Sequence, residues 1–140
     1  MLLFLDANVL FSAAYRDTGS VRILFSLAEA RGCELVASAY AIDEARRNLA
    51  EKHPDRLGDF ARLLERLRVC PEASHEAVAW AAARKLPPKD APILAAAVQA
   101  GADVLVTGDR THFGALFGKT LRGTEVLLPV DAIERLIAAG

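Results

Sequence analysis

The chain has 140 residues, of which 53% are apolar and 25% are charged, and its formal net charge is −1. This length and composition predict a single globular domain over residues 1–140 with a sizeable core, and they exclude a disordered chain. The near-zero net charge excludes a strong overall field for nucleic acid, so any nucleic-acid chemistry must come from a local site.

Membrane, secreted and zinc-binding classes are also disfavoured. No apolar run approaches the ~20 residues that a membrane-spanning helix needs. The first apolar run has no basic stretch ahead of it and is interrupted early by Asp6, so we expect no signal peptide. Cys33 and Cys70 belong to no C-x-x-C motif or histidine cluster, which argues against a zinc site or a disulfide framework. We therefore expect a cytoplasmic protein without a membrane partner.

The predicted elements alternate between strand and helix. The apolar run Leu2–Leu5 predicts a strand that is buried on both faces. Helices are predicted at 9–15 and, after a start at Thr18–Ser20, up to Gly32. Further strands are predicted at 34–37, 69–70, 104–107 and 125–128, and further helices at 39–52, 57–67, 74–86, 93–100 and 131–139, with a short turn or helix at 112–117. This alternation predicts a three-layer α/β/α fold around a central parallel sheet of four to five short strands.

Four acidic residues occupy positions that this fold brings together. Asp6 and Asp109 each follow a short buried strand, and the carboxyl ends of parallel strands are where such sheets bind ligands. Asp90 opens one helix, and Glu44 lies in the first turns of another. Converging carboxylates repel one another unless cations hold them, and oxygen ligands select Mg²⁺ or Mn²⁺. Such a site suits metal-assisted hydrolysis of phosphodiester bonds.

Each of these positions also has a structural interpretation. Asn8, two residues after Asp6, is interpreted on its own as the cap of the helix at 9–15. Asp90 is equally well explained as a helix cap and as a functional acid, and Asp109 could be a turn residue. Helical periodicity alone places Glu44 opposite the apolar stripe and therefore in solvent. Asp6 is the hardest to explain structurally, because an acid that ends so apolar a strand is rarely idle.

With these residues in place, the chain resembles the PIN domain family of metal-dependent ribonucleases over nearly its whole length. Four segments carry the resemblance: Leu5–Leu10; Ser38 followed by Glu44 and Leu49; Lys89–Ala95; and Val104–Asp109. The resemblance implies Mg²⁺ or Mn²⁺ as cofactor, with the following roles: Asp6, Glu44, Asp90 and Asp109 as catalytic and metal-binding acids, and Asn8 and Thr107 as supporting residues. It overrules the periodicity argument for Glu44. The chain departs from the pattern at His112, where many relatives carry a further acid ahead of the phenylalanine.

Stand-alone PIN domains of this length resemble the toxin components of type II toxin–antitoxin pairs. The resemblance implies an RNA substrate, a homodimer and a cognate antitoxin protein. Lys89 and Arg110 are the candidates for phosphate contacts, whereas Arg46, Arg47 and Lys85 are interpreted as solvated surface residues. We interpret His112 as a surface histidine, with a phosphate contact as the alternative.

Two other classes remain open. A PIN-like module that binds RNA or protein without cleaving it is supported by the missing acid at His112 and opposed by the four acids that are present. An α/β phospho-acceptor or phosphatase is ranked lowest, since Asp6 has no adjacent acid and Asn8 stands where the phosphatases carry their second acid.

Overall fold

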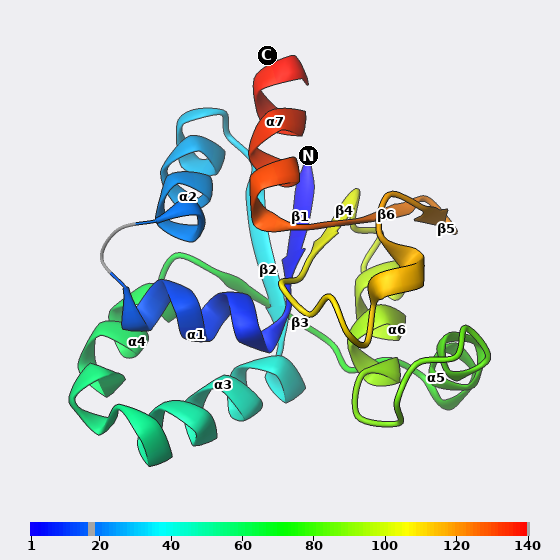
Figure 1. Ribbon diagram of the computed structural model, residues 1–140, viewed down its shortest axis with the longest axis horizontal. Helices are drawn as coiled ribbons and strands as arrows, with labels where there is room; N and C mark the ends of the chain where they lie inside the picture. Colours follow the sequence, from blue (N-terminus) through cyan, green and yellow to red (C-terminus); the bar gives the residue numbers. More distant parts are fainter. Residues whose placement is uncertain (17–18, 140) are drawn as a thin grey trace.

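The computed structural model describes residues 1–16 and 19–139, and the six strands within these ranges form one sheet in the order β3-β2-β1-β4-β6-β5 (Figure 1). The strands are β1 (Leu2–Leu5), β2 (Glu34–Ser38), β3 (Arg68–Cys70), β4 (Val104–Val106), β5 (Thr120–Leu121) and β6 (Thr124–Leu127). Only β5 runs antiparallel to its neighbour. The predicted α/β class with a largely parallel sheet is confirmed. The described residues form six strands, more than the four to five expected, because of the short β5.

Seven α-helices connect and flank these strands within the described residues. They are α1 (Ala7–Tyr15), α2 (Ser20–Ala30), α3 (Ala39–Lys52), α4 (Leu57–Leu64), α5 (His75–Ala82), α6 (Ala91–Gln99) and α7 (Pro129–Ala139), with short 3-10 helices at Pro54–Arg56 and Gly114–Leu116. The predicted start of the second helix includes Thr18, which lies outside the described residues. No helix in the described ranges has both the length and the apolarity to cross a bilayer.

The helices form a layer on each face of the sheet. The crossover from β1 through α2 to β2 and the crossover from β3 through α5 and α6 to β4 run in opposite directions across the sheet, so right-handed connections place them on opposite faces. The last helix, α7, packs against α2 (Figure 1). Because both faces are covered, Leu3, Phe4 and Leu5 of the central strand β1 are fully buried.

The direction of the chain across the sheet reverses between β1 and β4. From β1 the chain moves outward to β2 and β3, and it then returns to β4 on the other side of β1. The carboxyl ends of two such strands border a crevice, which is the usual ligand site of open α/β sheets. Helices α1 and α3 both begin at this edge and run side by side away from it (Figure 1). The fold therefore places the end of β1, the end of β4 and the starts of these helices around one crevice.

Candidate active site

The register between β1 and β4 brings Asp6 and Thr107 together. Leu5 pairs with Val106, and the backbone N–H of Asp6 donates to the carbonyl oxygen of Val106 at 3.0 Å. The next residue on each strand is therefore Asp6 on one side and Thr107 on the other. Both side chains are buried, with exposed fractions of 2% and 0%.

The carboxylate of Asp6 is held by three donors. Its Oδ1 accepts a hydrogen bond from the N–H of Ala7 at 2.7 Å, which makes Asp6 the N-cap of α1. Its Oδ2 accepts from Oγ1 of Thr107 at 2.7 Å and from Nδ2 of Asn8 at 3.3 Å. These bonds fix the orientation of the carboxylate at the end of β1.

Asn8 connects the two strand ends and does not cap the helix. Its Oδ1 accepts from the N–H of Gly108 at 2.9 Å, and its Nδ2 also lies 3.4 Å from Oγ1 of Thr107. The interpretation of Asn8 as a helix cap is wrong, because Asp6 takes that position and Asn8 lies within the first turn of α1. Asn8 and Thr107 both contact the carboxylate of Asp6, and their supporting role in a metal site stays a prediction.

Asp109 is oriented by the loop that follows β4. Its N–H donates to Oγ1 of Thr107 at 3.1 Å, and its Oδ1 accepts from the N–H of His112 at 2.9 Å. The second oxygen, Oδ2, lies 2.8 Å from Nδ1 of His112. Asp109 is thus a turn residue, as the structural interpretation proposed, and it nonetheless lines the cavity at the crevice.

Asp90 and His112 meet at the start of α6. Asp90 occupies the N-cap position of α6, but its side chain makes no capping hydrogen bond. A capping role therefore does not explain why an aspartate stands at this position. Its Oδ2 lies 2.9 Å from Nδ1 of His112, and both atoms are buried without a well-oriented hydrogen bond. The interpretation of His112 as an unengaged surface histidine is therefore wrong, since its ring lies within 3 Å of two carboxylates.

All four predicted acids line one cavity of about 600 Å³ at this crevice. Glu44 is half-buried and faces the cavity from α3, so the periodicity argument that placed it in solvent is wrong. The described residues that line the cavity are Asp6, Asn8, Phe11, Glu44, Arg47, Asn48, Glu51, Lys52, Lys89, Asp90 and Asp109.

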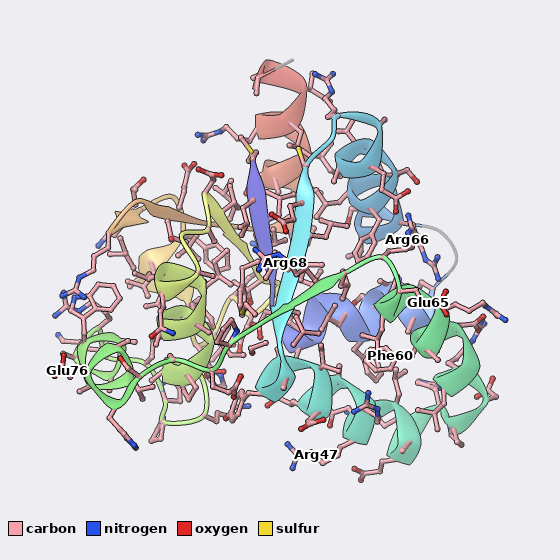
Figure 2. The ribbon with its side chains drawn as sticks, turned by 180° about the vertical axis from the view of Figure 1, so that it is seen from behind. Arg47, Phe60, Glu65, Arg66, Arg68 and Glu76 are labelled. Atoms are coloured by element: carbon pink, nitrogen blue, oxygen red, sulfur yellow. The ribbon has the colours of Figure 1, made fainter. Side chains whose placement is uncertain are left out.

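Two cations at this cavity differ from those that the sequence favoured, because Arg47 was interpreted as a solvated surface residue and Lys52 was not considered. Lys89 lines the cavity as expected, whereas Arg110 is exposed and is not among the lining residues. Arg47, which projects from α3 (Figure 2), and Lys52 near the end of α3 line it instead. The signal that could have found them is their helical spacing from Glu44, because residues three, four, seven or eight positions apart share one face of a helix.

Burial and mutual repulsion disfavour the charged forms of the inner acids. Desolvation raises the pKa of Asp6 from 3.8 to about 6, against the lowering effect of the hydrogen bonds from Thr107 and Ala7. The negative charges of Asp90 and Glu44 add to the increase. Burial likewise raises the pKa of Asp90, and nearby His112 opposes that shift. A bound cation would favour the ionised forms of all these carboxylates.

The donor set fits a divalent metal ion. Ligand atoms of Asp90, Asp109 and His112 all lie within 4.8 Å of one another. The buried and poorly paired Oδ2 of Asp90 points to a missing electropositive partner at this place. Carboxylates suit Mg²⁺ and Mn²⁺, and a ring nitrogen is tolerated better by Mn²⁺ than by Mg²⁺.

Comparison with known proteins identifies a family that matches most of the chain. A family model described as PIN domain matches residues 3–111. The comparison with curated proteins gives no match.

The fold is also similar to several solved structures. VapBC2 from Rickettsia felis, solved bound to a DNA fragment from their promoter, matches with a TM-score of 0.71 and 16% identity over 91% of this chain and 98% of that one. DNA-bound VapBC from Salmonella typhimurium matches with a TM-score of 0.68 and 20% identity over 92% of this chain and 99% of that one. PAE2754 from Pyrobaculum aerophilum gives a TM-score of 0.67 and 20% identity over 99% of both chains. At these identities the likeness shows the fold.

Proposed function

Because the chain belongs to the PIN domain family, we propose that it is a metal-dependent endoribonuclease that hydrolyses phosphodiester bonds in RNA. The observation that carries this proposal is the meeting of four carboxylates, from four separate parts of the chain, in one cavity at the switch point of the sheet. Asp6, Glu44, Asp90 and Asp109 hold the metal, which we propose to be Mg²⁺ or Mn²⁺.

The side chains around the acids orient the carboxylate of Asp6 and bind the phosphates of the RNA. When bound, the metal supplies Lewis-acid chemistry for the attack of water on phosphorus. Thr107 and Asn8 hold the carboxylate of Asp6 in place through their hydrogen bonds. Lys89 and Arg47, which line the cavity beside the acids, supply positive charge for the phosphates of the RNA.

We further propose that the protein acts as the toxin of a toxin–antitoxin pair, as a homodimer that a cognate antitoxin protein inhibits. The similar structures from Rickettsia felis and Salmonella typhimurium are of VapBC bound to DNA. FitAcB from Neisseria gonorrhoeae is similar as well. The large exposed apolar side chains of Ile23 on α2 and of Ile137 on α7 offer surface for such contacts.

A second candidate is a PIN-like module that binds RNA or protein without cleaving it. The observation that favours it is the ring of His112, which lies within 3 Å of both Asp90 and Asp109. His112 favours the ionised form of Asp90 by lowering its pKa, so it offsets part of the repulsion between the acids without a metal. If the protein is such a module, Asp90→Asn should raise the unfolding free energy in metal-free buffer and should remove no cleavage activity.

The test combines metal binding with RNA cleavage. Mn²⁺ titration by calorimetry, after removal of metals with EDTA, is expected to show saturable binding to the wild type and much weaker binding to Asp90→Asn. Asp6→Asn and Asp109→Asn are each expected to lower cleavage of a confirmed RNA substrate by on the order of 100-fold or more while the fold stays intact.

Asp43→Asn is the matched control. Asp43 precedes Glu44 on α3, but its side chain is exposed and pairs with Arg46 at 2.9 Å. It should therefore keep wild-type metal binding and cleavage. Wild-type cleavage in both Asp6→Asn and Asp109→Asn would refute the nuclease proposal and leave the binding module.

A further inference from the structure

The wall of the cavity beyond the acids carries one aromatic ring among polar side chains. Of the described residues that line the cavity, Phe11 is the one apolar residue. It lies on α1 three residues after Asn8, which is about 4.5 Å further along the helix axis. Its side chain is only partly buried, although it packs against the core. A partly open ring therefore lies about one helical turn from Asn8, in the cavity that the acids also line.

Two more rings continue the surface away from the acids. Tyr15 follows Phe11 by four residues on the same face of α1, and His53 caps the end of α3. The rings of Tyr15 and His53 are stacked with centroids 4.0 Å apart, and each centroid lies 6.0 Å from that of Phe11. All three rings are half-buried. Phe11, Tyr15 and His53 are called the aromatic platform below.

Cations border the aromatic platform. Nζ of Lys52 lies 5.9 Å from the ring centroid of Phe11, and the guanidinium of Arg16 lies 5.9 Å from that of Tyr15. Arg47 also lines the cavity, and Glu51 is the acid on this part of its wall. Two rings of the platform thus have a cation over them, and Phe11 connects the platform to the cavity of the proposed metal site.

We propose that the aromatic platform stacks an unpaired base of the RNA substrate, next to the phosphate that the acids and their metal hold. This inference rests on the proposed nuclease function and adds to it a subsite that stacks one base. Aromatic side chains stack on exposed bases without needing a particular sequence, and cations at the rim bind the adjoining phosphates. A base within an A-form duplex is already stacked on its neighbours and cannot lie on the platform.

The surroundings favour a nucleotide over a protein segment. A protein that docks through apolar contacts needs an apolar surface, whereas Phe11 is surrounded in the cavity by Asn48, Glu51, Lys52 and the acids. A nucleotide requires a flat ring for the base and a cationic site for the phosphate. Phe11 offers the ring in this one cavity, and Arg47, Lys52 and Lys89 line the same cavity with positive charge.

The experiment measures the binding of a short fluorescein-labelled single-stranded RNA, with Ca²⁺ in place of Mn²⁺ to suppress cleavage. Phe11→Ala is expected to weaken binding by about 10-fold, the effect of losing one stacked base. Phe11→Leu keeps most of the packing volume but has no aromatic face, so it should weaken binding similarly. Phe11→Trp should retain or improve binding. The same RNA annealed to its complement should bind all four proteins equally.

Trp80 provides the matched control. It is a half-buried ring on α5 beneath Arg84 and Arg122, but it lies outside the cavity. Trp80→Leu should therefore leave RNA affinity unchanged. In a Trp80→Phe background, the new indole of Phe11→Trp should be quenched by single-stranded RNA and not by duplex.

The outcomes separate this inference from the proposed function. Phe11→Ala and Phe11→Leu should keep wild-type Mn²⁺ affinity, which shows that the acid site is intact. Unchanged RNA affinity in both variants, with Mn²⁺ binding retained, would overturn the platform and leave the nuclease proposal standing. Loss of binding to a protein partner, with RNA binding unchanged, would overturn it too and assign the rings to that partner. If the wild type binds neither Mn²⁺ nor RNA, both proposals fail.

Discussion

At the residue level, Thr107 is the side chain on which the acids after β1 and β4 both depend. Its hydroxyl donates to Oδ2 of Asp6 at 2.7 Å and accepts from the N–H of Asp109 at 3.1 Å. The hydroxyl is fully buried, so water cannot replace it readily. One hydroxyl therefore couples the positions of two proposed metal ligands.

We predict that Thr107→Val weakens Mn²⁺ binding by about 10-fold to 100-fold, the usual effect of losing a group that orients a ligand. The substitution keeps the shape of the side chain but leaves Asp6 and Asp109 each without one hydrogen bond, which should cost about 1–3 kcal/mol of unfolding free energy. Calorimetry and urea denaturation measure the two effects. Thr107→Ser keeps the hydroxyl and should retain most of the affinity; equal losses in both variants would contradict the argument.

At the level of elements, the local sequence predicted most of the fold. The consecutive apolar residues of β1 and β4 are recognisable as strands in the sequence, and Pro and Gly mark many helix ends. The apolar stripe around α4 extended the predicted helix to residue 67, whereas the helix ends at Leu64 and the chain turns into β3. Strand β5 has two residues and no pattern of its own, since it exists only because β6 lies beside it.

The site was only partly predictable because its geometry is tertiary. Asp6 and Asp109 follow from the strand ends, but the position of Glu44 contradicts the periodicity of its own helix. The role of Asn8 depends on a hydrogen bond to Gly108, one hundred residues away in sequence. Likewise, the contact of His112 with Asp90 requires the loop after β4 to pack against the start of α6. No local pattern contains that information.

Helix α3 links the end of β2 to the acid site, so its N-cap should affect both stability and metal binding. Ser38 is fully buried, and its Oγ accepts from the N–H of Ala41 at 3.2 Å. We predict that Ser38→Ala lowers the unfolding free energy by about 1 kcal/mol and weakens Mn²⁺ binding, because the first turns of α3 position Glu44. Urea denaturation and calorimetry measure the two quantities.

Ser74→Ala is the control for this prediction. Ser74 caps α5 in the same way, with its Oγ accepting from the N–H of Ala77 at 3.1 Å, but α5 contributes no residue to the cavity. It should lose similar or somewhat less stability and keep wild-type Mn²⁺ affinity. A loss of Mn²⁺ affinity in Ser74→Ala as large as in Ser38→Ala would show that stability alone, and not the position of Glu44, governs binding.

At the level of the whole molecule, the acid cluster links folding to pH and to metal. Burial raises the pKa of Asp6 to about 6 in the folded chain, while the unfolded chain has the ordinary value of 3.8. Between these two values the folded state binds more protons than the unfolded state, so rising pH removes stability. The contribution of Asp6 is fully present below about pH 4 and is lost as the pH rises through about 6. Metal bound to the folded chain acts in the opposite direction.

We predict that, in EDTA, the unfolding free energy of the wild type relative to Asp6→Asn falls by about 2 kcal/mol between pH 4 and pH 7, which is most of the roughly 3 kcal/mol that the full shift in pKa represents. The comparison with the variant cancels the titration of groups that do not interact with Asp6, since the amide that replaces the carboxyl group does not titrate in this range. Urea denaturation at a series of pH values measures the difference. Mn²⁺ at about 100 times its Kd should add about 2.7 kcal/mol to the unfolding free energy of the wild type at pH 7 and much less to that of the variant, because the ion stabilises only the folded chain that binds it. If the two proteins show the same dependence on pH in EDTA, then Asp6 is ionised in the folded chain without a metal, and the acid cluster is stable without the cation that its geometry suggests.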